Sequence, residues 1–425
     1  MRVLRDVWCE ITSFGQLETA YKKARKGKRY RIEVLVFKSD LDSNLLRIQE
    51  QLRNGTFQFG PYRRHWVYIP KKRIVMALPF DSRIVQWSIY LTLMPYFDRL
   101  MIEDSYACRV GKGSLAAVER LQYWLQQIER RPGDWYIIKI DISKYFYRVD
   151  HKVLLDILSY RIEDPDLMAM LDTIINCDGE KFGLPRFTGP EDIPPEEWLS
   201  DVGMPIGNLT SQLFANIYLN ELDQFCKHVL GIHYYIRYMD DVIVIVNGKD
   251  RANEIKERIT AFLIERLRLD VNDKTTIRPA SAPVEFVGYI VTARKKKLRK
   301  PTVKRIKRSF RAICRYYFSG EMSKEEFDRR VASYKGVMSH CDCGNLEKRL
   351  NEIYIREKER AEEMSNLQMI EALCQLCEAQ SKIIRAQAAR LAELGAVCMT
   401  DEIAAADKLY QSIIGGPGDF AEYID

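Results

Sequence analysis

Three aspartates stand at or near the ends of apolar runs, where carboxylates could do chemistry. Asp141 follows the apolar segment 135–140, and Asp240 and Asp241 interrupt a second apolar segment, 234–246. Adjacent carboxylates repel one another and resist burial. An ordinary turn would explain the pair by itself, since Asp favours turns. Three converging carboxylates, however, are what a pair of Mg²⁺ ions needs, because Mg²⁺ prefers carboxylate oxygens together with substrate phosphates.

The chemistry that such a site would support is phosphoryl transfer. Two metal ions about 3.5–4 Å apart stabilise the attacking and leaving oxygens of an in-line displacement. We expect Asp141 and Asp240 to bridge both ions and Asp241 to contribute more weakly. The expected cofactor is a pair of Mg²⁺ ions, for which Mn²⁺ could substitute.

Whether the three aspartates lie close together depends on how the strands that carry them pair. Residues 135–141 predict a buried strand with Asp141 at its C-terminal end. Residues 234–246 predict two strands joined at the acidic pair. If the two segments pair in one sheet, the three carboxylates meet at one edge of it.

Other elements frame these strands. A hairpin over residues 61–76 would carry three cations at its tip, Lys71, Lys72 and Arg73. Residues 178–203 contain four Pro and four Gly and predict a loop. A short β region is expected at 283–298, and helices are expected within 12–60, 80–130, 149–176, 208–229, 251–267, 303–318 and 356–394.

The basic charge lies in the first 350 residues. The formal net charge of all 425 residues is +7, whereas residues 351–425 hold 7 Lys and Arg against 14 Asp and Glu, a net of −7. Residues 1–350 therefore carry +14, which is +7 minus −7. A region with this net positive charge favours a polyanionic partner, most commonly nucleic acid. A soluble basic protein without such a partner could have the same composition.

The densest cationic segment is 294–315, which contains 12 Lys and Arg and no acid. The apolar spacing over 303–318 predicts a basic amphipathic helix. We expect Lys304, Arg305 and Arg308 to follow a nucleic-acid backbone, with binding that weakens steeply as the salt concentration rises.

The cysteines and the hydropathy of the sequence indicate the cellular compartment of the protein. Ten cysteines at irregular spacing, with no run of small apolar residues at the start of the chain, predict free thiols in the cytoplasm. No stretch approaches the roughly 20 apolar residues of a membrane helix, so we expect no membrane partner. Cysteines within 340–343 and 374–377 could hold zinc, but four suitable ligands are required and helical packing explains 374–377 equally well.

Several segments resemble the conserved motifs of reverse transcriptases. Residues 238–241 (YMDD) resemble motif C, 141–146 (DISKYF) motif A, and 203–212 (GMPIGNLTSQ) motif B. Further blocks resemble the fingers, the segment before motif A, motif D and motif E, in that order: 70–73 with 81–83, 105–109, 272–275 and 286–289. Seven blocks in the family's order, over about residues 50–290, make the resemblance specific.

The resemblance implies an α+β fold, a right-hand polymerase with an antiparallel palm sheet. Its expected parts are an N-terminal region and fingers at 1–130, a palm at 131–290 with a fingers insertion at 151–200, and a thumb at 291–350. Residues 351–425 would form a helical C-terminal extension. The implied activity is extension of a primer with dNTPs on an RNA template, by an RNA-directed DNA polymerase of the nucleotidyltransferase class.

The resemblance also implies roles for single residues. Phe146 would block a ribose 2′-hydroxyl, and Lys274 would protonate the leaving pyrophosphate. Gly207 would let the backbone approach template or nucleotide, and Gln212 would hydrogen-bond one of them. Each also has an ordinary interpretation: a core aromatic, an exposed Lys, a helix-entry Gly and an exposed Gln.

Cations near the hairpin and before motif A complete the expected site. Lys71 and Arg73 would neutralise the incoming triphosphate, although Lys is also common at solvated strand edges. Arg109, in the block before motif A, would contact nucleic acid.

Motif B narrows the expected biology. Ile206 and Gln212 resemble the enzymes of bacterial and phage diversity-generating retroelements, as does the thumb segment 333–336. That role implies error-prone cDNA synthesis. The alternatives are a phage-defence reverse transcriptase that copies a dedicated non-coding RNA, and a maturase-like RNA-binding protein without synthesis. The expected partners are template RNA and cDNA, with an accessory RNA-binding protein or self-association through 351–425.

Overall fold

The computed structural model describes residues 3–68, 73–177, 180–393, 405 and 408. The chain divides into two compact units, Met1–Lys297 and Leu298–Asp425. Within the described residues, no helix is both long and apolar enough to cross a membrane.

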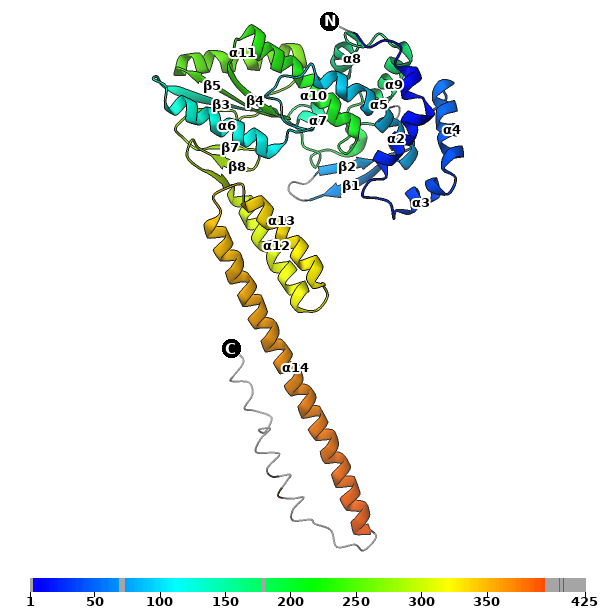
Figure 1. The fold of residues 1–425 in the computed structure, drawn as a ribbon, viewed down its shortest axis with the longest axis vertical. Coiled ribbons are helices and arrows are strands. Elements are labelled where there is room, and N and C mark those ends of the chain that lie inside the picture. The colour runs from blue at the N-terminus through cyan, green and yellow to red at the C-terminus, as the bar shows by residue number, and fades with distance from the viewer. Residues whose placement is uncertain (1–2, 69–72, 178–179, 394–404, 406–407, 409–425) are drawn as a thin grey trace. The chain divides into compact units, whose positions relative to one another are not determined.

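A four-stranded antiparallel sheet lies toward one end of the first unit (Figure 1). Its strand order is β4 (Tyr234–Tyr238), β5 (Asp241–Asn247), β3 (Trp135–Asp141) and β6 (Thr276–Pro279). Both β4 and β3 pair with β5, and β6 pairs with β3. The antiparallel sheet and the two strands predicted within 234–246 are confirmed.

Helices cover both faces of this sheet. Side chains of β5 alternate: Val242 and Val244 share a buried cluster with α10 (Leu209–Gln224) and α11 (Lys249–Leu267). Ile243 and Ile245 belong to a second cluster with α6 (Ser114–Glu129) and the strands β7 and β8. Figure 1 shows α11 and α6 on opposite sides of the sheet. Because neither face meets water, segment 234–246 is almost continuously apolar instead of alternating.

A hairpin and a long loop form a separate small core. Strands β1 (Arg63–Val67) and β2 (Arg73–Ala77) pair antiparallel, which confirms the predicted hairpin. Its predicted tip, with Lys71 and Lys72, lies outside the described residues. Side chains of β2 pack against the Pro- and Gly-rich loop, with Ile74, Met76, Phe182, Leu184 and Trp198 all buried.

Helices and short strands complete the first unit. Side-chain caps begin three helices: Ser13 accepts a hydrogen bond from the Gln16 N–H, Asp150 from Val153 and Asp164 from Leu167. The remaining elements are α1 (Trp8–Ile11), α2 (Phe14–Ala24), α3 (Ile32–Ser39), α4 (Leu41–Arg53), α5 (Phe80–Asp98), α7 (Tyr145–Arg148), α8 (His151–Ser159), α9 (Pro165–Asn176), η1 (Pro195–Glu197), η2 (Phe225–Val229), β7 (Val284–Phe286), β8 (Tyr289–Val291) and β9 (Lys296–Leu298).

Three helices make up the described part of the second unit: α12 (Lys300–Phe318), α13 (Lys324–Met338) and α14 (Gly344–Glu393). Aromatic contacts join them, such as Tyr317 stacked on Phe327 with ring centroids 4.4 Å apart, and Phe318 against Tyr354 at 5.3 Å. The basic helix predicted over 303–318 is confirmed. Helix α14 begins twelve residues before the predicted start at 356, because its first turns bury Leu346 and Leu350.

Candidate active site

Two of the three aspartates face each other across the sheet. Asp141, the last residue of β3, is the register partner of Asp241, the first residue of β5. Directly opposite residues of an antiparallel pair have their Cβ atoms about 4.5–5.5 Å apart and on the same face, where like charges destabilise each other. This side of the sheet therefore has a concentration of negative charge that a cation would relieve.

The third aspartate belongs to the connection between β4 and β5. Tyr238 pairs with Asp241, so Met239 and Asp240 form a two-residue turn. Met239 has a φ of 53°, in the left-handed region that Gly, Asn and Asp adopt far more readily. A non-Gly residue held in this region stores strain, and strained backbone clusters at functional sites.

Asp241 is held in surroundings that disfavour its charge. Burial raises its pKa to about 6, against the opposing effect of Lys139. Its Oδ1 atom is buried and accepts no hydrogen bond, and the Lys139 Nζ lies 3.5 Å away. Lys139 donates instead to the carbonyl of Glu285, at 2.6 Å. The side chain of Asp241 nevertheless keeps 27% of its surface exposed, so solvent or a ligand can reach it.

The segment that resembles motif D runs beside Asp141. The Asn272 N–H donates to the carbonyl of Asp141 at 2.8 Å, and the Asp141 N–H donates to the Thr275 hydroxyl at 3.3 Å. Lys274 lies between these two residues with an exposed side chain. The fold therefore brings the turn that carries Lys274 to the end of β3.

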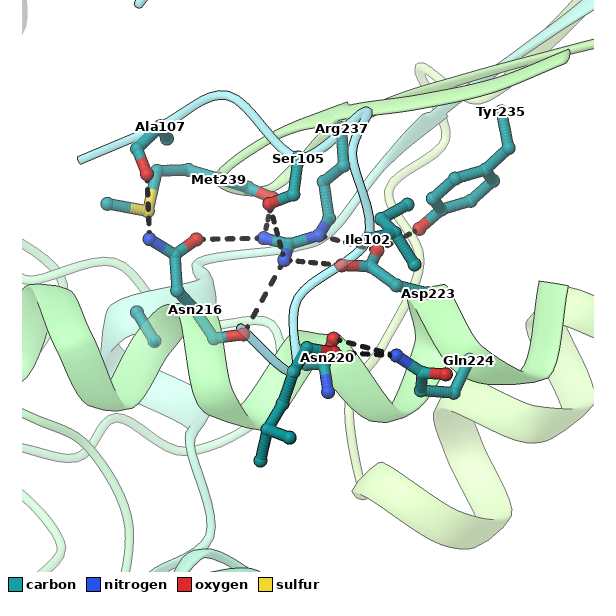
Figure 2. Close-up of polar contacts among 12 residues, drawn as sticks. Ile102, Ser105, Ala107, Asn216, Asn220, Asp223, Gln224, Tyr235, Arg237 and Met239 are labelled. Carbon is teal, nitrogen blue, oxygen red and sulfur yellow. Dashed lines mark hydrogen bonds and ion pairs between the residues drawn. The ribbon is translucent and has the colours of Figure 1, made fainter. Parts of the chain in front are cut away.

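Beneath the turn, a buried polar network connects β4 to α10 and to the segment before α6 (Figure 2). Arg237 and Asp223 are both fully buried and form an ion pair of 2.7 Å. Asp223 also accepts a hydrogen bond from the Tyr235 hydroxyl, at 2.6 Å. The sequence-based candidates did not include either member of the pair. In the sequence, each of the two residues is a charged side chain within a largely apolar segment. Burying such a charge costs free energy unless it is paired.

Gly207 makes a close approach, but to another part of the chain. Its φ is 121°, and a Cβ atom there would lie 2.6 Å from the carbonyl oxygen of Met76 in β2. The Met76 N–H donates to the neighbouring carbonyl of Ile206 at 2.7 Å. The observed contact that requires glycine is therefore with the hairpin, and a nucleotide contact stays a prediction.

The side chains of three other residues predicted to contact substrate differ in their exposure to solvent. Phe146 is half-buried against the core, and its carbonyl accepts from the Met204 N–H, which joins the segments resembling motifs A and B. Gln212 is exposed and its Oε1 lies 3.4 Å from the Cys108 thiol. Arg73 begins β2 with an exposed side chain, next to the undescribed hairpin tip.

Arg109 makes its observed contacts within the protein. Its guanidinium bonds to the Asp98 carboxylate at 2.6 Å and to the carbonyls of Ile102 and Ser105 at 2.6 and 2.9 Å. Only 7% of the side chain is exposed. These donors serve the loop after α5, so Arg109 stabilises that loop, and its nucleic-acid contact stays a prediction.

The cations of the basic helix are exposed on α12, in the second unit. Lys304, Arg305 and Arg308 all face solvent. Further along the same helix, Arg311 and Arg315 pair with Glu357 of α14, at 3.4 and 2.9 Å. Glu357 thus pairs with the second half of the basic helix and leaves Lys304, Arg305 and Arg308 of the first half outside this pairing.

Part of the acidic site fits a divalent metal ion. Asp141 and Asp241 share one face, and Asp241 offers a buried oxygen without a hydrogen bond. Carboxylate oxygens are the donors that Mg²⁺ prefers. In the part of the chain that the structure describes, however, no three acidic, His or Cys side chains gather closely enough to hold a metal ion. Asp240 would have to turn toward the other two to complete the set.

Comparisons with known proteins agree with the motifs. A family model described as reverse transcriptase (RNA-dependent DNA polymerase) matches residues 69–291. Protein YkfC of Escherichia coli is 27% identical over 279 residues, which cover 57% of this chain and 69% of that protein. The group II intron-encoded protein LtrA of Lactococcus lactis is 23% identical over 337 residues, covering 62% of this chain and 51% of that protein.

Two further proteins are similar to this chain. The putative COX1/OXI3 intron 2 protein of Saccharomyces cerevisiae is 24% identical over 310 residues, covering 59% of this chain but only 34% of that protein. Telomerase of Candida tropicalis, solved with a fragment of telomeric RNA, is 12% identical and covers 72% of this chain and 59% of that chain. The TM-score of this match is 0.41.

The matched family span of 69–291 is more than half of the 425 residues and contains Asp141, Asp240 and Asp241. With its antiparallel palm sheet and right-hand polymerase fold, the chain belongs to the reverse transcriptase family, RNA-directed DNA polymerases of the nucleotidyltransferase class.

Proposed function

We propose that the protein extends a primer with dNTPs on an RNA template by a two-metal-ion mechanism. The observation that carries the proposal is the register pairing of Asp141 with Asp241, next to the turn that holds Asp240. Family membership makes RNA-directed DNA synthesis the reaction class, and the family generally uses divalent metal ions. Mg²⁺, with Mn²⁺ as a substitute, is the proposed pair of ions.

Asp141, Asp240 and Asp241 would hold the ions through carboxylate oxygens. When bound, the metals would lower the pKa of the primer 3′-hydroxyl and stabilise the charge that develops on the transferred phosphate. Asp241 has to be ionised for this task, although burial favours its neutral form. A neighbouring divalent ion would stabilise the ionised carboxylate.

The other contacts position substrate and move protons. Phe146 would exclude the ribose 2′-hydroxyl, and Gln212 would hydrogen-bond the template or nucleotide. Arg73, with Lys71 of the undescribed hairpin tip, would bind the triphosphate, because cations and charge-assisted hydrogen bonds stabilise phosphate oxygens. Lys274 would donate the proton to the leaving pyrophosphate.

Template and product contacts would extend along α12. Lys304, Arg305 and Arg308 are exposed on one helix, so they could neutralise successive phosphates of the template–primer. The extension 351–425 would serve self-association or the docking of an accessory RNA-binding protein.

The biological role proposed first is that of a diversity-generating retroelement, from Ile206 and Gln212 of motif B. A phage-defence enzyme that copies a dedicated non-coding RNA is the second candidate. A maturase-like role without synthesis is the third candidate, since the chain is similar to intron-encoded proteins. Sequencing the RNA and cDNA that copurify with the protein would separate these roles.

Primer extension on poly(rA)/oligo(dT) with Mg²⁺ tests the activity. The variant Asp240→Ala with Asp241→Ala should lose at least about a thousandfold in rate, since the metals would supply most of the charge stabilisation. It should remain as stable as the parent, because the change removes like charges that oppose each other. Asp250→Ala, an exposed change at the start of α11, is the control. Full incorporation by the double variant would refute the assignment.

Substrate choice is tested separately through Phe146. Phe146→Ala should raise the rate of rNTP incorporation relative to dNTP by roughly tenfold or more, because a steric gate is removed. Phe146→Tyr keeps the ring and should keep the discrimination. Unchanged selectivity in the Ala variant would remove Phe146 from the site.

A further inference from the structure

We propose that Arg237 is a positioning residue whose guanidinium, anchored by Asp223, holds the backbone of the Met239–Asp240 turn in the orientation from which Asp240 can turn toward Asp141 and Asp241. The inference rests on the proposed polymerase function and adds a residue outside the three carboxylates. Neither member of the ion pair would touch substrate or metal. Their effect would reach the reaction only through the backbone of the turn.

The guanidinium makes hydrogen bonds in several directions at once. Nε and Nη2 donate to the two carboxylate oxygens of Asp223, each at 2.7 Å. Nη1 donates to Asn216 Oδ1 at 3.1 Å and to the carbonyl of Met239 at 3.3 Å. Nη2 also reaches the Ser105 hydroxyl at 3.1 Å. The N–H donors of this one arginine are thereby shared among three different chain segments.

These contacts join the turn to two elements that are distant in sequence. Backbone bonds add to them: the Arg237 N–H donates to the carbonyl of Asp104, and the Tyr106 N–H donates to the carbonyl of Arg237, both at 3.0 Å. Asn216 of α10 donates to the carbonyl of Ala107 at 2.8 Å. Strand β4, at the edge of the sheet, is therefore fixed on its outer side by segment 104–107 and from below by α10 (Figure 2).

The contact with Met239 is the one that bears on catalysis. Met239 lies in the left-handed region, which its side chain disfavours. Its carbonyl belongs to the peptide that leads directly into Asp240. A donor from Arg237 to that carbonyl holds the peptide in this orientation. Without the donor, the peptide can rotate to a relaxed conformation, and Asp240 then loses the backbone position from which its side chain can turn toward Asp141 and Asp241.

The burial of the Arg237–Asp223 ion pair indicates that its role is to hold the geometry of the turn. Arg237 and Asp223 are each 0% exposed. Desolvation of two charges offsets much of their attraction, so apolar or neutral replacements of a buried ion pair are often as stable as the pair itself. A rigid fork that bonds a carboxylate and a turn carbonyl together is something that a neutral pair does not provide.

The test compares stability with metal dependence in single-nucleotide incorporation. The neutral double variant Arg237→Met with Asp223→Asn should fold and keep most of the parent's stability, since Asn keeps an acceptor for Tyr235. Its rate at saturating dNTP should fall by about 100-fold, as expected for a misplaced catalytic group. The Mg²⁺ concentration for half-maximal rate should rise, while template–primer affinity stays unchanged. A folded double variant with parental rate and Mg²⁺ dependence would overturn the proposal.

A rescue experiment separates positioning from general structural support. Met239→Gly, added to the double variant, should restore a substantial part of the rate, because Gly adopts the left-handed conformation without help. A failure of rescue, with the triple variant folded, would mean that the pair does not act through the turn.

A second single variant covers the case in which the double variant fails to fold. Arg237→Lys keeps the charge opposite Asp223 but removes the fork that also reaches Met239. It should shift the Mg²⁺ dependence, whereas Arg25→Lys, at a half-buried position at the end of α2 that does not touch the turn, should not. Equal Mg²⁺ dependence in both variants would overturn the proposal. If the unmodified protein incorporates no dNTP, the proposed function fails, which is a separate outcome.

Discussion

Two arginine–carboxylate sites, one in each unit, show how differently the same chemical pair can be used. Arg237 and Asp223 are 0% exposed and bond each other at two positions, both 2.7 Å. At the second site, Glu357 is only 6% exposed, but its partners Arg311 and Arg315 are 48% and 56% exposed. In the first site both charges are buried; in the second the acid is buried and the cations face water.

This difference shows that burial determines whether an arginine can bind a ligand or only other groups of the protein. The donors of Arg237 are directed at the protein interior, so this residue can only shape the fold around the turn. Arg311 and Arg315 line a polar pocket of about 610 Å³ in the second unit, together with two further arginines and three glutamates: Arg356, Arg360, Glu357, Glu359 and Glu363. Exposed guanidinium groups of this kind can still meet an anion, although Glu357 competes for them.

The largest expected difference between the sites is in stability. Arg237→Met leaves the carboxylate of Asp223 buried without its partner, which should lower the free energy of unfolding by about 3–5 kcal/mol. Arg311→Met removes an exposed partner and should cost less than about 1 kcal/mol. Urea unfolding followed by Trp fluorescence reports on the first unit, because all six Trp residues precede residue 298, and circular dichroism adds the helical second unit.

The control for this measurement is the neutral pair, Arg237→Met with Asp223→Asn, which should recover most of the stability that the single variant lacks. Equal destabilisation by Arg237→Met and Arg311→Met would show that burial does not separate the two sites.

A second, smaller difference should appear in the salt dependence of nucleic-acid binding. Replacing Lys304, Arg305 and Arg308 by Gln should reduce the slope of log affinity against log salt by about 0.9 for each duplex phosphate that is no longer neutralised. Arg237→Lys should leave the slope unchanged, because a buried cation neutralises no phosphate. Fluorescence anisotropy of a labelled template–primer, measured from about 50 to about 200 mM KCl, gives the slope. An unaltered slope in the triple variant would place the nucleic acid elsewhere.

The smallest expected effect is an increase in affinity. Glu357→Gln removes the acid that competes for Arg311 and Arg315, so nucleic-acid affinity should rise slightly and the salt slope should steepen by at most about 0.9. Glu371→Gln, an exposed change on the same helix, is the matched control for net charge. The same anisotropy assay measures the affinity and the salt slope of both variants. Equal values for the two variants would mean that Arg311 and Arg315 do not face the nucleic acid.

Local pattern was enough for most of the elements. The apolar segments at 135–141 and 234–246, the hairpin at 61–76 and the basic helix at 303–318 were all predictable, because strand and helix periodicity is a property of neighbouring residues. The start of α14 was placed too late, since residues 344–355 become helical against α12 and the sequence-based prediction relied on the apolar repeat further along.

Side-chain partners within the protein were much harder to predict. Arg109 was expected to bind nucleic acid but bonds Asp98 and the loop after α5. Gly207 was expected to face template or nucleotide, whereas the close approach observed in the structure is to Met76. The two cases share one physical cause: a charged or a missing side chain indicates that something comes close, but its identity depends on segments far away in the chain.

By itself, the sequence determined that three aspartates stand at strand ends, in a chain with the motif order of a polymerase. The tertiary structure alone decided that Asp141 and Asp241 are directly opposed and that Arg237 bonds the turn beside them. The reason is range. Periodicity and turn chemistry are set within a few residues, whereas the Arg237 network joins residues up to 132 positions apart, which only packing brings together.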